Sequence, residues 1–415
     1  MSITTDQALE PVRSDEIHGH VSDGFHAVRE AFAENFSRRK ELGAACCVYR
    51  DGEKVVDLWG GIRNKATGEP WEADTMVLVF SATKGLAAMV MALAHSRGLL
   101  DYDERIVTYW PEFAQNGKEN VTVRQLLAHQ AGLFAFDERV DKSVVADLDR
   151  LAGVMARQKP EWEPGTRQAY HAISLGFYEG ELLRRIDPQH RTLGQFFQEE
   201  IAGPLGAGIY IRLPEEIPNS RLATLQKAKT REVIFGLPFR LLLTSMNPRS
   251  PIFRALLKPN PGPWVPLDDE RIYARNFEVP SGGGVGSARG IARVYSAFAR
   301  GGHELGLRPE TLQALMAPAV PPAHGFRDEG LKCEVQFSLG FFKPTADQPF
   351  GRPGAFGSPG SGGAFGFADP ELGLAYAYVT NRMGRNVVTD ERDIALRDAL
   401  SSVIGQEERQ GGVRQ

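Results

Sequence analysis

The chain has 415 residues, of which 42% are hydrophobic and 24% are charged, and its formal net charge at pH 7 is −4. This length exceeds the size at which one hydrophobic core stops growing, so we expect two domains or one domain with a large insertion. The charge balance argues against nucleic acid as a partner, and three cysteines, of which Cys46 and Cys47 are adjacent, exclude a disulfide scaffold.

The amino-terminal part predicts a helix followed by an antiparallel hairpin. Residues 1–20 show no basic region followed by an apolar run, so no secretory signal is visible and we expect a cytoplasmic protein. Residues 22–38 repeat four apolar side chains at helical spacing behind a Ser22 or Asp23 cap, which indicates an amphipathic helix. The stretch GAACCVYRDGEKVVDLWGG then predicts two strands that turn at residues 50–53.

The carboxyl-terminal part carries the remaining strands. Residues 334–342 and 362–381 predict a strand and a second hairpin, and residues 390–404 predict a closing helix. The patterns between these two ends are mostly helical and are broken by Pro and Gly clusters. We therefore expect an α/β (α+β) fold in which residues 1–84 and 320–415 form a discontinuous antiparallel-sheet domain, with residues 85–319 as an inserted helical domain.

One motif suggests chemistry. The stretch VFSATKGLAAMVMALAHSRGLL, residues 79–100, places Ser81 one helical turn before Lys84, so the lysine can reach the serine hydroxyl. Two interpretations are open: a helix-capping serine beside a solvated lysine, or a nucleophile beside a base whose pKa is lowered by its apolar surroundings. The other Ser-x-x-Lys, at Ser37 and Lys40, lies on a charged helix end, which is typical of a solvated surface.

Two further segments could complete a site around Ser81. Tyr170 follows a Pro-Gly turn and precedes a predicted helix, so it lies on a connection, where catalytic side chains are often presented. Its ring could instead simply pack in the core. The segment FGSPGSGGAFGFADP, residues 356–370, is rich in glycine, which permits close approach of the backbone to a ligand, although an exposed loop has the same composition.

In this order and spacing, S-A-T-K at 81–84, Y-H-A at 170–172 and S-P-G at 358–360 resemble the three motifs of the serine β-lactamase and penicillin-binding-protein superfamily. The chain is most similar to the class C-like esterase branch, the family VIII carboxylesterases, and the likeness extends to stretches such as WEADTMVLVFSATK and GFADPELGLAYAYVTN. The resemblance implies a β-lactamase-like fold, an antiparallel sheet flanked by the terminal helices plus a helical domain, with the active site in the cleft between them.

The resemblance also implies roles for single residues. Ser81 would be the acylated nucleophile, Lys84 would share its proton, and Tyr170 would act as general base and later as acid toward the leaving group. The N–H groups of Ser81 and Ser361 would form the oxyanion hole. Whether Lys84 is neutral, or is a cation that stabilises a Tyr170 phenolate, stays open, and the pair is treated as one coupled base.

Further residues of these motifs are candidates for contact with substrate: His171, Ser358 and Gly360. His171 could equally be a structural residue. Ala172 stands where the β-lactamases have an asparagine, and Ser358 where they have a lysine and many esterase relatives a histidine or tryptophan. Both changes remove groups suited to an amide and a carboxylate, so we expect cleavage of carboxylic esters with short to medium acyl groups and little β-lactamase activity.

Other functions remain as alternatives. An acyltransferase of the same fold would pass the acyl group to an alcohol or amine, a peptidase or amide hydrolase is a variant, and an inactive binding protein is a third hypothesis. No G-x-S-x-G and no H-E-x-x-H occurs, so we expect neither an α/β-hydrolase site nor a metal or cofactor. The expected partner is a small-molecule ester. We expect no transmembrane segment, and whether the protein forms a homo-oligomer stays open.

The segment at residues 233–259 is unusually rich in large apolar residues. It could be core of the helical domain, a wall of an acyl pocket, or a contact with a membrane surface or a second subunit.

Overall fold

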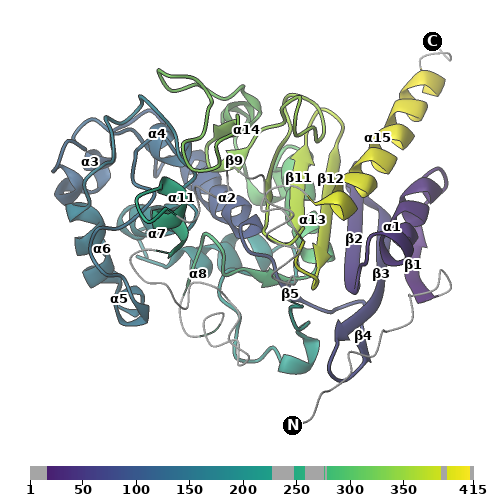
Figure 1. Cartoon of the computed structure of the whole chain (residues 1–415). Coiled ribbons are helices and arrows are strands. Elements are labelled where there is room, and N and C mark those ends of the chain that lie inside the picture. Colours follow the sequence, from purple (N-terminus) through teal and green to yellow (C-terminus); the bar gives the residue numbers. More distant parts are fainter. Residues whose placement is uncertain (1–15, 227–246, 258–274, 276–277, 385–389, 412–415) are drawn as a thin grey trace, which may run out of the picture.

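The computed structural model describes residues 16–226, 247–257, 275, 278–384 and 390–411 (Figure 1). Its main element is a nine-stranded sheet with the order β1-β3-β2-β12-β11-β10-β9-β8, in which β4 pairs with β3 beside this path and every pairing is antiparallel. Strands from both ends of the chain thus meet in one sheet, where β2 pairs with β12 from Ala44 opposite Thr380 to Arg50 opposite Leu374. A small second sheet has the order β5-β7-β6.

The strands are β1 (Ile17–Val21), β2 (Gly43–Arg50), β3 (Glu53–Asn64), β4 (Glu69–Pro70), β5 (Val77–Leu78), β6 (Ile209–Tyr210), β7 (Val285–Gly286), β8 (Phe337–Ser338), β9 (Phe341–Phe342), β10 (Phe356–Pro359), β11 (Phe365–Asp369) and β12 (Leu374–Thr380). The helices are α1 (His26–Arg38), α2 (Ala82–Ser96), α3 (Ile106–Tyr109), α4 (Val123–Leu127), α5 (Lys142–Ala146), α6 (Leu148–Arg157), α7 (Ser174–Ile186), α8 (Leu193–Phe197), α11 (Pro251–Leu257), α13 (Ala288–Ala299), α14 (Pro309–Met316) and α15 (Glu391–Gly411). Short 3₁₀ or π turns are η2 (Pro111–Phe113), η3 (Gln198–Ala202), η4 (Asn219–Arg221) and η5 (His303–Leu305).

The two faces of the large sheet pack on different helices. In β12, Tyr376 and Tyr378 belong to the hydrophobic cluster that contains buried residues of α1 and α15, whereas Ala375 and Ala377 belong to the cluster built on α2 and α13. This alternation follows from the period of two along a strand. The terminal helices α1 and α15, which also pack on each other, therefore cover one face of the sheet and α13 covers the other (Figure 1).

The structure confirms the fold class expected from the sequence. The first hairpin turns at Asp51 and Gly52, whose φ angles of 51° and 84° suit a tight two-residue turn. The second turns between Asp369 and Leu374. The first helix starts later than expected, because its N-cap is Phe25, which makes no side-chain cap bond, rather than Ser22 or Asp23.

The division into residues 1–84 with 320–415 and residues 85–319 stays a prediction. One helix does not follow this division in its simplest form. Helix α13 lies within residues 85–319 but packs on β2, β11 and β12 of the large sheet. Its apolar face, which includes Ile291 and Tyr295, is buried against the sheet. The sheet therefore needs a helix from the middle of the chain to cover its second face.

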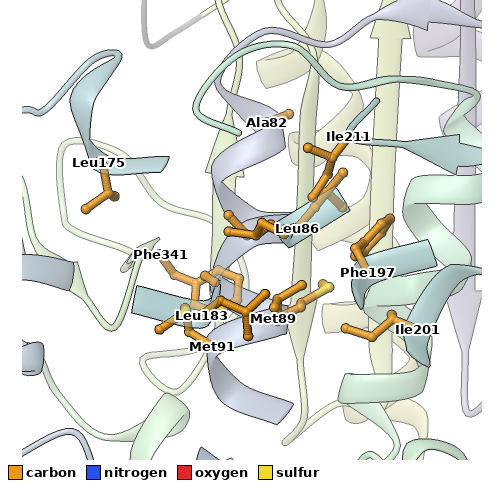
Figure 2. Packing of buried hydrophobic residues seen from close by; sticks show 14 of the residues in the cluster. Ala82, Leu86, Met89, Met91, Leu175, Leu183, Phe197, Ile201, Ile211 and Phe341 are labelled. Carbon is orange, nitrogen blue, oxygen red and sulfur yellow. The ribbon is translucent and has the colours of Figure 1, made fainter. Parts of the chain in front are cut away.

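Helix α2 lies at the centre of the molecule and is buried on all sides except near its two ends. Figure 2 shows its side chains Leu86, Met89 and Met91 packed among residues of α7, α8 and the segment around β9. A helix that is apolar all round belongs in a core rather than on a surface. This burial holds the first turn of α2, which carries Ser81 and Lys84, in one place.

Candidate active site

Ser81 occupies the N-cap position of α2, but its side chain makes no capping hydrogen bond. The capping interpretation of this serine is therefore wrong, and the hydroxyl is directed to other partners. The residue before it, Phe80, has a φ of +49°, a left-handed conformation that is uncommon for a bulky residue. Thr83 supports this bend, because its hydroxyl donates to the Phe80 carbonyl and accepts from the Gly284 N–H. Such strain persists only where the surrounding structure enforces it.

Lys84 lies one turn further along α2 and is completely buried. Its Nζ lies 2.6 Å from the carbonyl oxygen of Ala172, 2.8 Å from that of Ser281 and 3.4 Å from the Ser81 hydroxyl. Burial lowers the pKa of the amine to about 7, although Glu179 opposes this shift. The two carbonyls therefore anchor the amine so that a third tetrahedral position around its nitrogen faces the Ser81 hydroxyl.

Tyr170 lies against both of these residues. Its side chain shares a hydrogen bond with Ser81, and its ring centroid lies 4.7 Å from Lys84 Nζ. Burial raises the pKa of the phenol above its ordinary value, while the Ser81 hydrogen bond opposes the rise. The ring stacks on Phe337 at a centroid distance of 5.8 Å, which fixes its plane. The structure thus brings the three residues predicted as catalytic into one cluster.

The loop that carries Tyr170 is held through its backbone by buried polar groups. The N–H of His171 donates to Nδ1 of His129 at 2.9 Å, and the N–H of Ala169 donates to the His129 carbonyl at 3.1 Å. The Tyr170 N–H faces the carboxylate of Asp328, which is buried and has its pKa raised to about 6 by that burial. His129 and Asp328 therefore position Tyr170, a role that their separation in sequence concealed.

The structure places His171 differently from the expected contact with substrate. Its ring is completely buried, Nδ1 lies 2.7 Å from the Ala169 carbonyl, and Nε2 lies 3.1 Å from the Leu133 N–H. A carbonyl can only accept and an N–H can only donate, so this ring is neutral with its proton on Nδ1. Burial lowers its pKa to about 4. Both nitrogens are used within the protein, and the side chain supports the Tyr170 loop instead of facing a ligand.

The chain approaches the start of α2 very closely at Gly360, the residue directly after β10. A Cβ atom at this position would lie 2.1 Å from the Val79 carbonyl oxygen and 3.1 Å from the Ala82 nitrogen, so only glycine fits. Ser358 is buried, and its hydroxyl donates to the Ser81 carbonyl oxygen at 2.8 Å. Ser358 and Gly360 thus hold strand and helix together, and their expected contact with substrate stays a prediction.

Ser361 follows at the tight turn after β10 and is partly exposed. The turn is closed by hydrogen bonds from the Gly360 N–H to the Ala364 carbonyl and from the Gly363 N–H to the Gly360 carbonyl. Because Gly360 touches the first turn of α2, its neighbour Ser361 lies beside the end of the helix that carries Ser81. The oxyanion role of Ser81 and Ser361 stays a prediction.

Some residues around this site carry no signal in the sequence. Ser281 contributes only a backbone carbonyl to Lys84, and its hydroxyl accepts the Gly176 N–H. Its segment PSGGG indicates a loop but not its contact. Glu179 is a buried carboxyl of α7 close enough to Lys84 for each to change the pKa of the other. A single Glu in a helical pattern gives no hint of such an environment.

The predicted apolar segment is only partly described, since residues 233–246 and 258–259 lie outside the described residues. Its described part includes α11, where Arg254 pairs with Asp137 and Glu161 and lies over the Phe134 ring. Within the described ranges, no group of three or more His, Cys, Asp or Glu side chains could hold a metal ion. In that same part of the chain, no helix is long and apolar enough to cross a membrane.

The fold and the candidate catalytic residues agree with a family of known proteins. The Beta-lactamase family model matches residues 28–401. The chain belongs to the beta-lactamase family. A curated relative, "Esterase/beta-lactamase LipL" of Mycobacterium tuberculosis, is 33% identical over 380 residues, which cover 90% of this chain and 85% of the relative.

Solved structures of related proteins have the same fold as this beta-lactamase family member. A family VIII carboxylesterase superposes with a TM-score of 0.81 at 36% identity, covering 94% of this chain and all of the other. EstA from Arthrobacter nitroguajacolicus Rue61a superposes with a TM-score of 0.80 at 32% identity, covering 93% of this chain and 98% of the other. The expected fold and the expected family are both confirmed.

Proposed function

We propose that this protein is a serine carboxylesterase that cleaves esters with short to medium acyl groups through an acyl-Ser81 intermediate. The observation that carries the proposal is the position of Lys84, whose buried amine is anchored by two carbonyls and faces the Ser81 hydroxyl. The names of LipL and EstA and of the family VIII carboxylesterase support an ester as the substrate class.

Two other buried lysines show why this arrangement favours a base. Lys118 donates to three carbonyls at 2.7 to 2.9 Å, and Lys343 donates to three carbonyls at 2.9 to 3.3 Å. Three acceptors match the three N–H donors of an ammonium, so this arrangement favours the cation, although burial lowers the pKa of both amines to about 8. Lys84 has only two carbonyl partners. Its neutral amine can therefore donate to both and still direct its lone pair at Ser81.

The first half of the reaction follows from this geometry. Lys84 accepts the Ser81 proton while the serine oxygen bonds to the ester carbonyl carbon, and negative charge develops on the carbonyl oxygen. Backbone N–H groups of Ser81 and Ser361 would stabilise that oxyanion, aided by the positive end of α2. Because burial makes the phenol a weak acid, Tyr170 is protonated at neutral pH and hydrogen-bonds to the serine oxygen.

Collapse of the tetrahedral intermediate releases the alcohol. The bond between the acyl carbon and the leaving oxygen breaks, Tyr170 donates its proton to that oxygen, and the Lys84 ammonium restores the phenol proton. The 4.7 Å between Lys84 Nζ and the Tyr170 ring centroid places donor and acceptor in the same cluster. Water then attacks the acyl-Ser81 ester and Lys84 again accepts the proton. The bond between the acyl carbon and the Ser81 oxygen breaks, Lys84 returns the proton to that oxygen, and the carboxylic acid leaves.

One residue of the second motif and one of the third favour esters over β-lactams. Ser358 stands where β-lactamases carry a cation, and its hydroxyl is already committed to the Ser81 carbonyl. Ala172 offers only its backbone carbonyl, which is bound by Lys84. Neither residue presents a group for a lactam carboxylate or amide, so uncharged esters are the better substrates.

Covalent labelling tests this function. The protein is incubated with an alkyl phosphonate p-nitrophenyl ester, and the modified peptide is identified by mass spectrometry. We expect one adduct, on Ser81, together with loss of p-nitrophenyl butyrate hydrolysis. An active enzyme with an unlabelled Ser81 would overturn the proposal. Adding an alcohol to the butyrate assay distinguishes the transferase alternative, since product ester in excess of butyrate would exclude a hydrolase.

A further inference from the structure

The turn that carries Ser361 contains two successive glycines with an intrinsically flexible backbone. Gly362 and Gly363 have φ angles of 94° and 115°, which glycine adopts freely and other residues rarely adopt. Glycine also loses more conformational freedom on folding than any other residue, so two in succession make a soft connection. Such a turn keeps a single shape only if hydrogen bonds hold its peptide groups in place.

A buried arginine from the last helix binds this turn. Arg392 lies in the first turn of α15 and is 3% exposed, and its Nη2 donates to the Gly362 carbonyl oxygen at 3.0 Å. The Gly384 N–H donates to the same oxygen at 3.2 Å. A carbonyl oxygen has two lone pairs, so both acceptor positions of this group are occupied. The turn is thereby anchored to the start of α15.

The guanidinium of Arg392 is itself held from several sides. Its Nε and Nη2 donate to the two carboxylate oxygens of Asp390, both at 2.8 Å. Its Nη1 donates to Glu41 at 2.9 Å, and Nη2 also lies 2.9 Å from the Arg382 carbonyl oxygen. A bidentate carboxylate fixes the plane of a guanidinium, whose N–H groups form a rigid fork. Arg392 therefore presents Nη2 to the Gly362 carbonyl with little freedom to move.

The hydrogen bonds of the turn connect this anchor to the Ser361 N–H. The peptide group whose carbonyl Arg392 binds also contains the Gly363 N–H, which donates to the Gly360 carbonyl at 3.1 Å. The Gly360 carbonyl in turn belongs to the same peptide group as the Ser361 N–H. Because a peptide group is planar and almost always trans, its N–H and its carbonyl point in opposite directions. A fixed Gly360 carbonyl therefore fixes the direction of the Ser361 N–H.

The N–H groups of Ser81 and Ser361 are free to bind another acceptor. Both residues lie outside the regular elements, and no backbone hydrogen bond between described residues uses either N–H as its donor. A Cβ atom at Gly360 would lie 3.1 Å from the nitrogen of Ala82, so the residues that precede Ser361 and follow Ser81 are in close contact. Two free donors at the start of α2 can thus serve an oxygen that the substrate brings.

We propose that Arg392 is a positioning residue, which acts through the Gly362 carbonyl to hold the Ser361 N–H in the direction that the oxyanion requires. The proposal rests on the proposed esterase reaction and its oxyanion hole. Donors stabilise a developing charge best when they already point at it, because the reaction then requires no reorganisation. A misdirected donor weakens binding of the transition state more than binding of the ester, so it lowers kcat rather than raising KM.

The test compares the wild type with Arg392→Lys on p-nitrophenyl butyrate and on its thionoester, in which sulfur replaces the carbonyl oxygen. Lysine carries its donors on one atom, so it can pair with a carboxylate but cannot also reach Gly362 as the fork does. We expect kcat for the oxygen ester to fall by roughly 10- to 100-fold, with KM changed by less than about threefold. Sulfur is a weak hydrogen-bond acceptor, so the preference for the oxygen ester over the thionoester should shrink by a similar factor.

Arg397→Lys is the matched control on the same helix. Arg397 is largely buried and ion-paired, and its hydrogen bonds to described residues go to Asp393, at 2.8 Å, and to the Pro349 carbonyl, both away from the turn. Its kcat and its preference for the oxygen ester stay at the wild-type values. Rates are measured at a temperature at which circular dichroism shows each variant to be folded, so a loss of stability alone does not change the preference.

The two esters also separate the two levels of inference. A wild-type preference equal to that of hydroxide-catalysed hydrolysis refutes the oxyanion hole of the proposed reaction. A larger wild-type preference that persists in Arg392→Lys, or a kcat that does not fall, refutes only the role of Arg392. If Arg392→Lys does not fold, the double variant Arg392→Gln with Glu41→Gln, which removes one charge of each sign, is measured instead and judged by the same criterion.

Discussion

Two buried clusters of charged residues in this protein differ in how their charges are paired. In the cluster at the start of α15, Arg392 donates to Asp390 at 2.8 Å and to Glu41 at 2.9 Å, and it also binds the Gly362 carbonyl at 3.0 Å. In the cluster at the start of α2, Lys84 binds only neutral oxygens. The first cluster pairs every strong charge directly, and the second pairs none.

The difference determines which charges can change. Burial alone would lower the pKa of Arg392, but the Glu41 and Asp390 carboxylates more than offset this, so the guanidinium is permanently charged. The pKa of Lys84 lies at about 7 because no direct carboxylate partner offsets its burial. The paired cluster therefore has a structural role, which includes holding the Gly362 turn beside Ser361. The unpaired cluster can exchange a proton during a reaction.

The largest expected effect comes from removing the nucleophile of the unpaired cluster. Ser81→Ala should lower kcat for p-nitrophenyl butyrate by about 10³-fold or more, because no acyl-enzyme can form. Ser37→Ala is the matched control, since Ser37 belongs to the other Ser-x-x-Lys and is exposed on α1. Its kcat should equal that of the wild type. Equal losses in the two variants would contradict the assignment.

Replacing each of two buried lysines by methionine tests whether a buried charge serves the reaction or the stability of the fold. Lys84→Met should lower kcat by about 10²- to 10⁴-fold, the range for loss of a general base, in a protein that remains folded. Lys118→Met should instead lower the melting temperature, because it leaves three carbonyls without a donor, while the folded enzyme keeps its kcat. Activity lost from Lys118→Met at temperatures where it is folded would remove the distinction.

Breaking the paired cluster should affect stability. Glu41→Gln removes the charge that binds Arg392, Tyr378 and Thr380, and leaves a buried guanidinium incompletely paired. The free energy of unfolding, measured in urea, should fall by about 3–5 kcal/mol. Glu34→Gln, at a partly exposed position of the preceding helix α1, should change it by less than about 0.5 kcal/mol. A similar cost at both positions would show that the network does not stabilise the fold.

The smallest effect is the response of the wild type to pH. Lys84 must be neutral to accept the Ser81 proton, and its pKa is lowered by burial to about 7. The value of kcat/KM should therefore be maximal above this pH and fall by about tenfold for each unit below it. Initial rates corrected for spontaneous ester hydrolysis measure the limb. A rate that is flat from pH 5.5 to 7 would exclude Lys84 as the base.

Most of the fold and the clustering of the candidate catalytic residues could be predicted from the sequence because they depend on local rules. Strand alternation and turn residues located both hairpins, and helical periodicity located the buried face of α15, which includes Leu396 and Leu400. Helix geometry alone brings Ser81 and Lys84 together. The order of the three motifs then predicted that Tyr170 would join them.

The partners of the other site residues could not be predicted, because they lie far away in the sequence. His171 and Ser358 were expected to contact substrate, but Leu133 and Ala169 take the ring nitrogens of the first and Ser81 takes the hydroxyl of the second. A residue type shows what a side chain can bind, not which partner reaches it first.

The family, the architecture and the candidate nucleophile follow from the sequence alone, since spacing and periodicity act within a few residues. The charge of the candidate site depends on the tertiary structure. The pKa of Lys84 follows from the depth of its burial, the two carbonyls that anchor it, and Glu179, which arrives on another helix. Electrostatic interactions act through space between segments that the chain separates by about a hundred residues, and no local pattern encodes their sum.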